Sequence, residues 1–106
     1  MEKVDRYRIL ERYKDIYEFI EVVGVWEFNI EDCPITLKIK VKKIAPQTYY
    51  GVANYKIKNP EQATPYMSMK NQKSVQEALE DALSGFMLHW NPKWKDQTEF
   101  VLVENW

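Results

Sequence analysis

The chain has 106 residues, of which 45% are hydrophobic and 29% are charged. This length suits one domain, expected to span residues 1–106, and the composition argues against a disordered polypeptide. The formal net charge of -1 provides no overall attraction to nucleic acid, and a single cysteine, Cys33, excludes an internal disulfide. The first residues are too charged for a signal peptide and no apolar run reaches the roughly 18 residues of a membrane span, so we expect a soluble cytoplasmic protein.

A first helix is predicted over residues 3–20. Its apolar side chains recur at helical spacing, at Ile9, Tyr13, Ile16, Tyr17 and Ile20. The end of this helix is open, because the sequence becomes β-prone from Ile16 and a strand could begin as early as Phe19.

Three strands are predicted next. The first covers residues 22–30, with Gly24, Trp26, Phe28 and Ile30 on one face. The second, over residues 35–42, alternates most regularly and turns four apolar side chains toward the core: Ile35, Leu37, Ile39 and Val41. After it, Lys43 and Ile44 break the alternation and indicate a bulge or the strand end. The third covers residues 48–58 and places the small residues Gly51 and Ala53 where a helix could pack.

The clearest helix lies at residues 74–90, which carry a continuous apolar stripe. Ser74, followed three residues later by Glu77, indicates a capping box, and Asn91-Pro92 ends the helix. Gly85 is unfavourable inside a helix and indicates a close backbone approach. A short strand is expected over residues 66–69. A last strand is expected over residues 98–103. The sequence does not determine its pairing partner, which could be the free edge of the first strand or a second copy of the protein.

Together these elements predict an α+β fold. It consists of an antiparallel β-meander of about four to five strands with an N-terminal helix, and the long amphipathic helix over about 74–90 packs on one face.

The first candidate site is an outward-facing lysine face. If the second and third strands pair as a hairpin, one side of the sheet gathers Lys38, Lys40, Lys42, Tyr50 and Lys56. Basic side chains interleaved with an aromatic ring can hold a phosphate backbone and stack a base, which suggests single-stranded nucleic-acid binding. The more ordinary interpretation is a solvated sheet face, partly neutralised by Glu27 opposite Lys38.

The second candidate site is a group of tryptophans. Trp90 is expected to complete the stripe of the long helix. Trp94 and Trp106 are candidate partner-binding residues, because tryptophan often anchors protein interfaces. The alternative is that these two side chains seal the edge of the core.

Catalytic chemistry has little support in the sequence. His89 is the single histidine, and with one cysteine it makes no metal-binding set. A Cys33–His89 nucleophile pair would need the fold to join a turn and a helix end. We therefore expect no catalytic residues, no metal and no cofactor.

One stretch resembles a known family. A strand carrying Tyr50 and Tyr55, a proline-containing loop and the sequence SVQEALEDA from Ser74 resemble the strand–loop–helix part of HicB-like antitoxins. The resemblance implies a protein that binds a toxin partner; many members also bind DNA through an appended domain. The loop at residues 59–64 lacks the Pro-Gly-Cys turn of that pattern, and no residue role is carried over.

The leading functional hypothesis is a non-enzymatic protein-binding or regulatory module that forms a homodimer or binds a protein partner. One alternative is single-stranded nucleic-acid binding through the lysine face. The other is a small ligand-binding protein or enzyme, with a pocket between helix and sheet near Tyr49, Gly51 and Tyr55.

Overall fold

The structure is a computed structural model that describes residues 3–106. Over this range the chain forms two α-helices and five antiparallel strands in two sheets, which confirms the predicted α+β class. In chain order the elements are α1 (Arg6–Arg12), β1 (Glu21–Asn29), β2 (Thr36–Ala45), β3 (Thr48–Ala53), β4 (Tyr55–Lys58), α2 (Val75–His89), the 3₁₀ turn η1 (Pro92–Trp94) and β5 (Glu99–Leu102).

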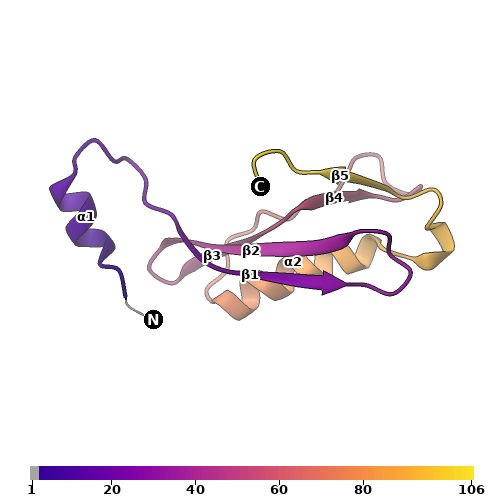
Figure 1. Cartoon of the computed structure of the whole chain (residues 1–106), viewed down its shortest axis with the longest axis horizontal. Coiled ribbons are helices and arrows are strands. Elements are labelled where there is room, and N and C mark those ends of the chain that lie inside the picture. Colours follow the sequence, from indigo (N-terminus) through magenta and orange to yellow (C-terminus); the bar gives the residue numbers. More distant parts are fainter. Residues whose placement is uncertain (1–2) are drawn as a thin grey trace.

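The main sheet is an antiparallel meander in the order β1-β2-β3, with α2 behind it (Figure 1). In the central strand β2, the side chains of Leu37, Ile39 and Val41 are fully buried, as the alternation predicts. The register with β3 shifts between Lys43 and Ala45, so the break in alternation is a bulge and the strand continues beyond it.

The helix α2 begins and ends close to the predicted residues. The Ser74 hydroxyl accepts a hydrogen bond from the Glu77 backbone N–H at 3.1 Å. The reciprocal half of the capping box differs, because the Glu77 carboxylate accepts from the backbone N–H of Lys73 at 3.2 Å. The helix ends at His89, immediately before Trp90 and the Asn91-Pro92 pair.

Small residues set the distance between α2 and the sheet. A Cβ atom added to Gly51 would lie 2.7 Å from the carbonyl oxygen of Ala78, so the helix backbone rests directly on β3. At Gly85 the close neighbour is the side chain of Tyr66, whose hydroxyl occupies the place of a Cβ. The predicted close approach at Gly85 is therefore to a tyrosine side chain rather than to backbone.

The core lies between α2 and both sheets. Phe86 is 2% exposed, and its ring centroid lies 6.3 Å from that of Phe100 on β5. Trp90 is buried and lies 5.9 Å from the same ring, which confirms that it completes the helix stripe. Trp90 and Phe100 therefore extend the core to the end of α2.

The prediction of one strand over residues 48–58 is wrong, because Asn54 divides it into β3 and β4. The Asn54 side chain accepts a hydrogen bond from the Lys38 backbone N–H at 2.8 Å and donates one to the Thr36 carbonyl at 3.2 Å. The Asn54 N–H still donates to the Lys38 carbonyl, but the Lys38 N–H bonds to the Asn54 side chain and the Asn54 carbonyl accepts from Val103 instead. The chain beyond Asn54 therefore leaves the main sheet.

The last strand pairs with β4 and not with the free edge of β1, which the sequence had left open as one possible partner. The antiparallel register joins Tyr55 to Leu102 and Lys58 to Glu99. The divergence at Asn54 frees β4 to receive β5, and the two form a separate sheet.

A short strand was expected over residues 66–69, but these residues, all of them described, form no strand. A single bridge joins Tyr66 to Ile57. Beyond it the Ser68 hydroxyl bonds to the Asp81 carboxylate on α2, so the segment follows the helix instead of extending a sheet.

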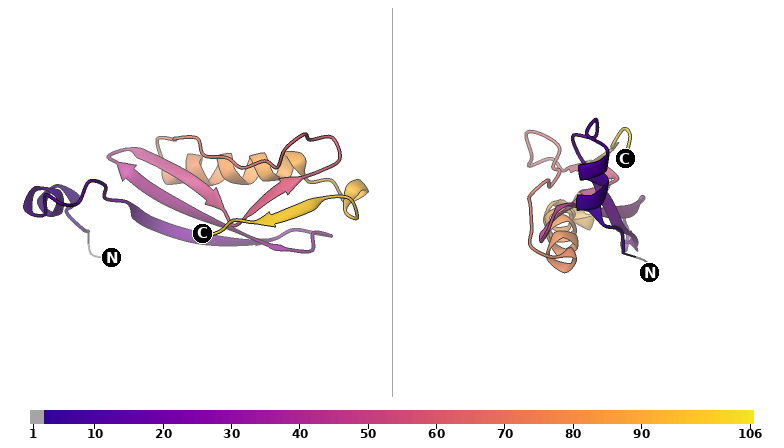
Figure 2. Two further views of the ribbon diagram at one scale, coloured as in Figure 1. Left: turned by 90° about the horizontal axis from the view of Figure 1, so that it is seen from above. Right: turned by 90° about the vertical axis from the view of Figure 1, so that its left-hand side faces the viewer.

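The N-terminal helix is much shorter than residues 3–20, because α1 covers only Arg6–Arg12. The chain returns from it in extended form, and residues 3–20, here called the N-terminal arm, project past the end of the main sheet (Figure 2). The radius of gyration is 16.2 Å, against about 13 Å for a compact chain of similar length. The predicted apolar stripe lies beyond the main sheet and has no surface of that sheet to pack on. An unpacked helix of that length has only marginal stability in water.

Candidate functional site

The structure brings together most of the predicted lysine face. Across β2 and β3, Lys42 lies opposite Tyr50 and Lys40 opposite Val52. Lys38 lies opposite Glu27 on β1, as predicted, and the two side chains form an ion pair at 3.4 Å. These lysines occupy the side of the main sheet opposite α2, here called the open face.

Lys56 does not join this group in the main sheet, because it lies on β4 and pairs with Val101 on β5. The Lys42 ammonium group lies 6.0 Å from the centroid of the Tyr50 ring. Lys42 and Tyr50 are therefore the part of the predicted constellation that remains a basic–aromatic pair.

Trp106 covers the middle of the open face. Its indole N–H donates to the Val52 carbonyl at 2.8 Å, and its ring centroid lies 4.2 Å from the Lys40 ammonium nitrogen. Lys40 also donates to the main-chain oxygen of Trp106. Lys40, predicted for nucleic-acid binding, and Trp106, predicted for partner binding, thus contact each other. Neither the strand alternation nor the group of tryptophans in the sequence indicates this contact.

Trp94 ends η1, directly after α2, whereas Trp106 contacts Val52 and Lys40 on the main sheet. It borders a shallow hollow with Asn59 and His89. Its carbonyl accepts a hydrogen bond from the Thr98 hydroxyl at 2.8 Å. The two candidate tryptophans therefore do not form one surface.

His89 and Cys33, the two residues considered for catalysis, pack within the fold. The His89 ring packs at 4.7 Å from the Tyr66 ring, and its carbonyl accepts from the Asn59 side chain at 3.0 Å. Burial raises the pKa of the Cys33 thiol, and a backbone hydrogen bond from Ile35 partly opposes this effect. A raised pKa lowers the thiolate fraction and therefore the nucleophilicity of Cys33. Residues 3–106 contain no group of three or more metal-binding side chains.

The space between α2 and the sheet at Gly51 is filled by the helix backbone at Ala78. The larger hollows lie elsewhere. One of about 710 Å³ follows the outer side of α2, and another of about 460 Å³ lies between α1 and the end of the main sheet.

The free edge of β1 was considered in the sequence only as a partner for the last strand, and it is an exposed surface of the molecule. This strand pairs with β2 on one side only, and over its nine residues it contains no proline, lysine or arginine. Three of its valines are exposed, with exposed fractions of 55% for Val22, 39% for Val23 and 48% for Val25. Basic residues, prolines and bulges usually protect such edges from other chains, and here only a register shift between Val22 and Gly24 is present.

The hydrogen-bonding direction of this edge follows from β2. The backbone N–H of Lys38 bonds to the Asn54 side chain, and its carbonyl accepts from the Asn54 N–H. Lys38 therefore directs its backbone groups away from β1, and its neighbour Glu27 directs its own toward the free edge. By alternation Val25 does the same.

The N-terminal arm continues this apolar surface along the chain. Its exposed apolar side chains are Val4, Tyr7, Tyr13, Ile16, Tyr17 and Ile20, and Tyr17 is 96% exposed. Most of them belong to the stripe from which the long first helix was predicted. The stripe was thus a signal of apolar surface, and the structure leaves that surface uncovered.

No family model matches this chain, and no curated protein or solved structure shows significant similarity to it. The resemblance to HicB-like antitoxins is therefore not supported by a family match. Within the described range, neither helix has both the length and the apolar character needed to cross a membrane.

Proposed function

We propose that this chain is a protein-binding module whose binding surface is the free edge of β1 together with the N-terminal arm. The observation that carries the proposal is the nine-residue edge with its exposed valines. A partner strand would pair with its unused N–H and C=O groups, and the apolar side chains would be covered at the same time.

The partner is a second copy of the chain, because the edge is self-complementary. In an antiparallel pair centred on Val25, the same residues of both copies meet in a closed two-fold arrangement. Gly24 then lies opposite Trp26 of the second copy, and Glu27 lies near its bulge at Val22–Gly24, so no like charges face each other. The charge of Glu27 is already balanced by Lys38.

The arm supplies area that a strand pair alone lacks. A stable interface buries about 800 Å² on each partner. The exposed side chains of Tyr13, Ile16 and Tyr17 lie on the segment that leads into β1 and would be covered with it. The proposal places the protein in the cytoplasm, where the lone thiol of Cys33 stays reduced.

The test is the molar mass in solution, measured by sedimentation or light scattering over a range of concentrations. We expect a dimer, and we expect Val25→Lys to give a monomer because it places two like charges at the two-fold axis. Val101→Lys is the matched control, since Val101 is an exposed valine on β5 outside this edge. Circular dichroism would establish that both variants are folded.

A monomeric wild-type protein at all concentrations, or a Val25→Lys variant that remains dimeric, would contradict the second copy as the partner. If the monomer instead binds an unrelated extended peptide at β1, the edge keeps its role and its occupant changes.

Single-stranded nucleic-acid binding is the second candidate function, and the Lys42–Tyr50 pair favours it. Oligonucleotide titrations at low and moderate salt would test it. Salt-dependent binding that is lost in Lys42→Glu and kept in Lys70→Glu is expected if the open face is the site. Equal losses in the two variants would point to a diffuse electrostatic effect.

A further inference from the structure

The side chain of Arg6 is an unusual feature at the base of the N-terminal arm. Arg6 is 7% exposed, and its Nη2 donates to the carbonyl groups of Phe19 and Lys43. The guanidinium carbon lies 5.3 Å from the centroid of the Phe19 ring. These contacts join α1 to the segment that returns from it, at Phe19, and to the main sheet at Lys43.

The second terminal nitrogen of Arg6, Nη1, is buried and has no hydrogen-bond partner among residues 3–106. Between residues 3 and 106 the single ion pair within 4 Å is Lys38–Glu27, so no described carboxylate forms an ion pair with Arg6. A buried charged donor without a partner is costly, and burial of an arginine normally comes with an acceptor.

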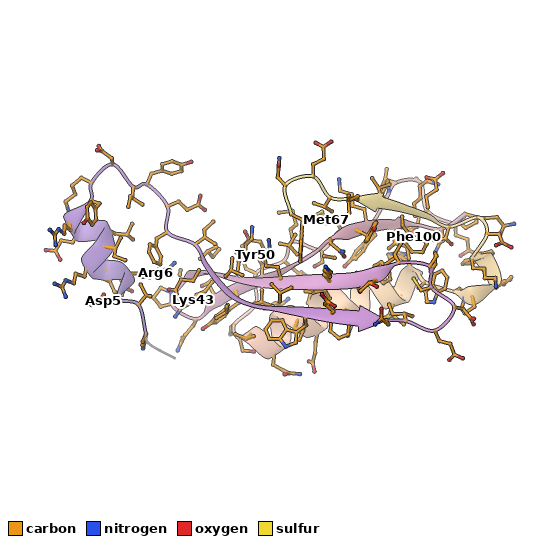
Figure 3. The ribbon with its side chains drawn as sticks, viewed as in Figure 1. Asp5, Arg6, Lys43, Tyr50, Met67 and Phe100 are labelled. Atoms are coloured by element: carbon orange, nitrogen blue, oxygen red, sulfur yellow. The ribbon has the colours of Figure 1, made fainter. Side chains whose placement is uncertain are left out.

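A hollow of about 460 Å³ lies against this arginine, between α1 and the end of the main sheet. In Figure 3, Asp5, Arg6 and Lys43 lie together at this junction. Its lining residues are Lys3, Val4, Asp5, Arg6, Tyr7, Glu21, Lys43 and Pro46. The volume is that of a small-molecule site.

The charges of the lining select the ligand chemistry. Three basic and two acidic side chains leave a formal charge of +1, which suits a monoanion better than a phosphate dianion. One of the acids, Asp5, already accepts from the Arg8 backbone N–H at 3.2 Å, and Glu21 lies opposite Lys43. Nη2 already donates to two carbonyl groups, so Nη1 is the terminal nitrogen left to donate to a carboxylate oxygen in a charge-assisted hydrogen bond.

The apolar part of the lining defines the rest of the ligand. Val4, Tyr7 and Pro46 face the same hollow, so a group attached to the carboxylate would meet hydrocarbon and an aromatic ring. We propose that this hollow binds a carboxylate carried on a small apolar body, with Arg6 as the principal anion-binding residue. The carboxylate belongs either to a free organic acid or to the end of a polypeptide chain.

Binding would also fix the arm. Arg6 already bridges Phe19 and Lys43, and an acceptor at Nη1 would add a further contact to the same joint. The hollow borders the proposed dimer surface, because Glu21 of β1 and residues 3–7 of the arm line it. Ligand binding is therefore measured at a protein concentration that keeps the chain monomeric.

The test is a titration of the full chain followed by backbone amide NMR shifts. The probes are benzoate, its neutral isostere benzamide, N-acetyl-leucine and inorganic phosphate, all at constant ionic strength. We expect saturable shifts with benzoate around residues 3–7 and 43–46 and none with benzamide. Tighter binding of N-acetyl-leucine than of benzoate would identify a chain end as the source, and the reverse order would identify a free acid.

Two variants locate the site. Arg6→Lys keeps the charge but loses the planar fork, and we expect affinity for benzoate to fall about tenfold. Because Arg6→Lys also alters the joint of the arm, Lys43→Met is the second variant. It removes the ammonium group but keeps the carbonyl that Arg6 binds, and it should weaken benzoate several-fold. Lys70→Met removes an exposed lysine that does not line the hollow and should leave the affinity unchanged.

Equal responses to benzoate and benzamide would overturn the proposal, as would tighter binding of phosphate than of benzoate. Shifts confined to Lys38, Lys40 and Lys42 would also overturn it, because they would assign the anion to the open face.

Discussion

The two helices of this molecule begin from similar sequence patterns and end in different structures. Both α2 and the N-terminal arm carry apolar residues at helical spacing. The helix α2 extends over Val75–His89 and buries Ala78, Ala82 and Phe86 against the sheets. The helix α1 stops at Arg12, and the arm beyond it leaves Tyr13 and Tyr17 in solvent.

The difference shows that an amphipathic pattern reports apolar surface more reliably than it reports helix. Packing against a surface supplies most of the stability of a protein helix. For α2 the small residues Gly51 and Ala53 provide that surface on β3. No comparable surface of the main sheet lies against the arm, and we expect changes in the two regions to have unequal effects.

The largest expected effect is at Phe86. Replacing it with alanine removes a ring that is 2% exposed and should lower the free energy of unfolding by about 3–5 kcal/mol. The matched arm variant, Tyr17→Ala, should change it by less than about 0.5 kcal/mol in a monomeric state, as surface substitutions do. Urea unfolding at a protein concentration that keeps the chain monomeric would compare them. Similar losses would mean that the arm is packed in solution.

Asn54 should rank second. Asn54→Ala leaves the Lys38 N–H and the Thr36 carbonyl without their partner, a loss of about 1–3 kcal/mol. Asn54→Asp is a sharper variant, because it keeps the acceptor for Lys38 but replaces the donor to Thr36 with a second acceptor. We expect both to destabilise the protein in urea unfolding. An unchanged midpoint would show that the division between β3 and β4 does not depend on this amide.

The two packed glycines test how rigid the covered side is. Gly51→Ala directs a methyl group at the Ala78 carbonyl, which only a shift of α2 can relieve, and should destabilise by about 1–3 kcal/mol. Gly85→Ala meets the end of the Tyr66 side chain, which can turn aside, and a gain of about 1 kcal/mol in helix propensity offsets the displacement. Thermal unfolding would rank them, and a larger loss at Gly85 would contradict this order.

The smallest effects should come from the helix caps. Ser74→Ala removes the acceptor for the Glu77 N–H and should lower stability by about 1 kcal/mol. Asp5→Ala removes the matching acceptor for the Arg8 N–H on α1. Because the arm adds little to the core, loss of this hydrogen bond should reduce the amide protection within α1. It should not change the midpoint of global unfolding. Equal midpoint changes would place both helices in one cooperative unit.

The parts of the fold that were predictable depend on local chemistry. The alternation of Leu37, Ile39 and Val41 fixed the buried side of β2, and the Ser74 cap located the start of α2. The division at Asn54 was hidden, because asparagine fits the alternation of the third strand as well as any polar residue. Its amide acts by replacing hydrogen bonds of β2, and no periodicity reports that role.

The candidate surfaces were predictable only in part. Lys38 opposite Glu27 followed from the hairpin register. The contact of Trp106 with Lys40 did not, since it depends on how β5 directs the chain after the division at Asn54. The exposure of the β1 edge depends on which strands pair. It could not be predicted, because the sequence did not show whether the last strand pairs with that edge.

The pairing of β4 with β5 has a consequence for the order of folding. The meander β1-β2-β3 closes through short turns, whereas the paired residues of β4 and β5 are 41 to 47 positions apart in the sequence. Closing that long loop is slower and costs more chain entropy, so β5 should dock after the meander and α2 have formed. Until then Ile57 and Phe86 lack the covering ring of Phe100. The folding chain therefore passes through a stage in which one end of its core is exposed to water.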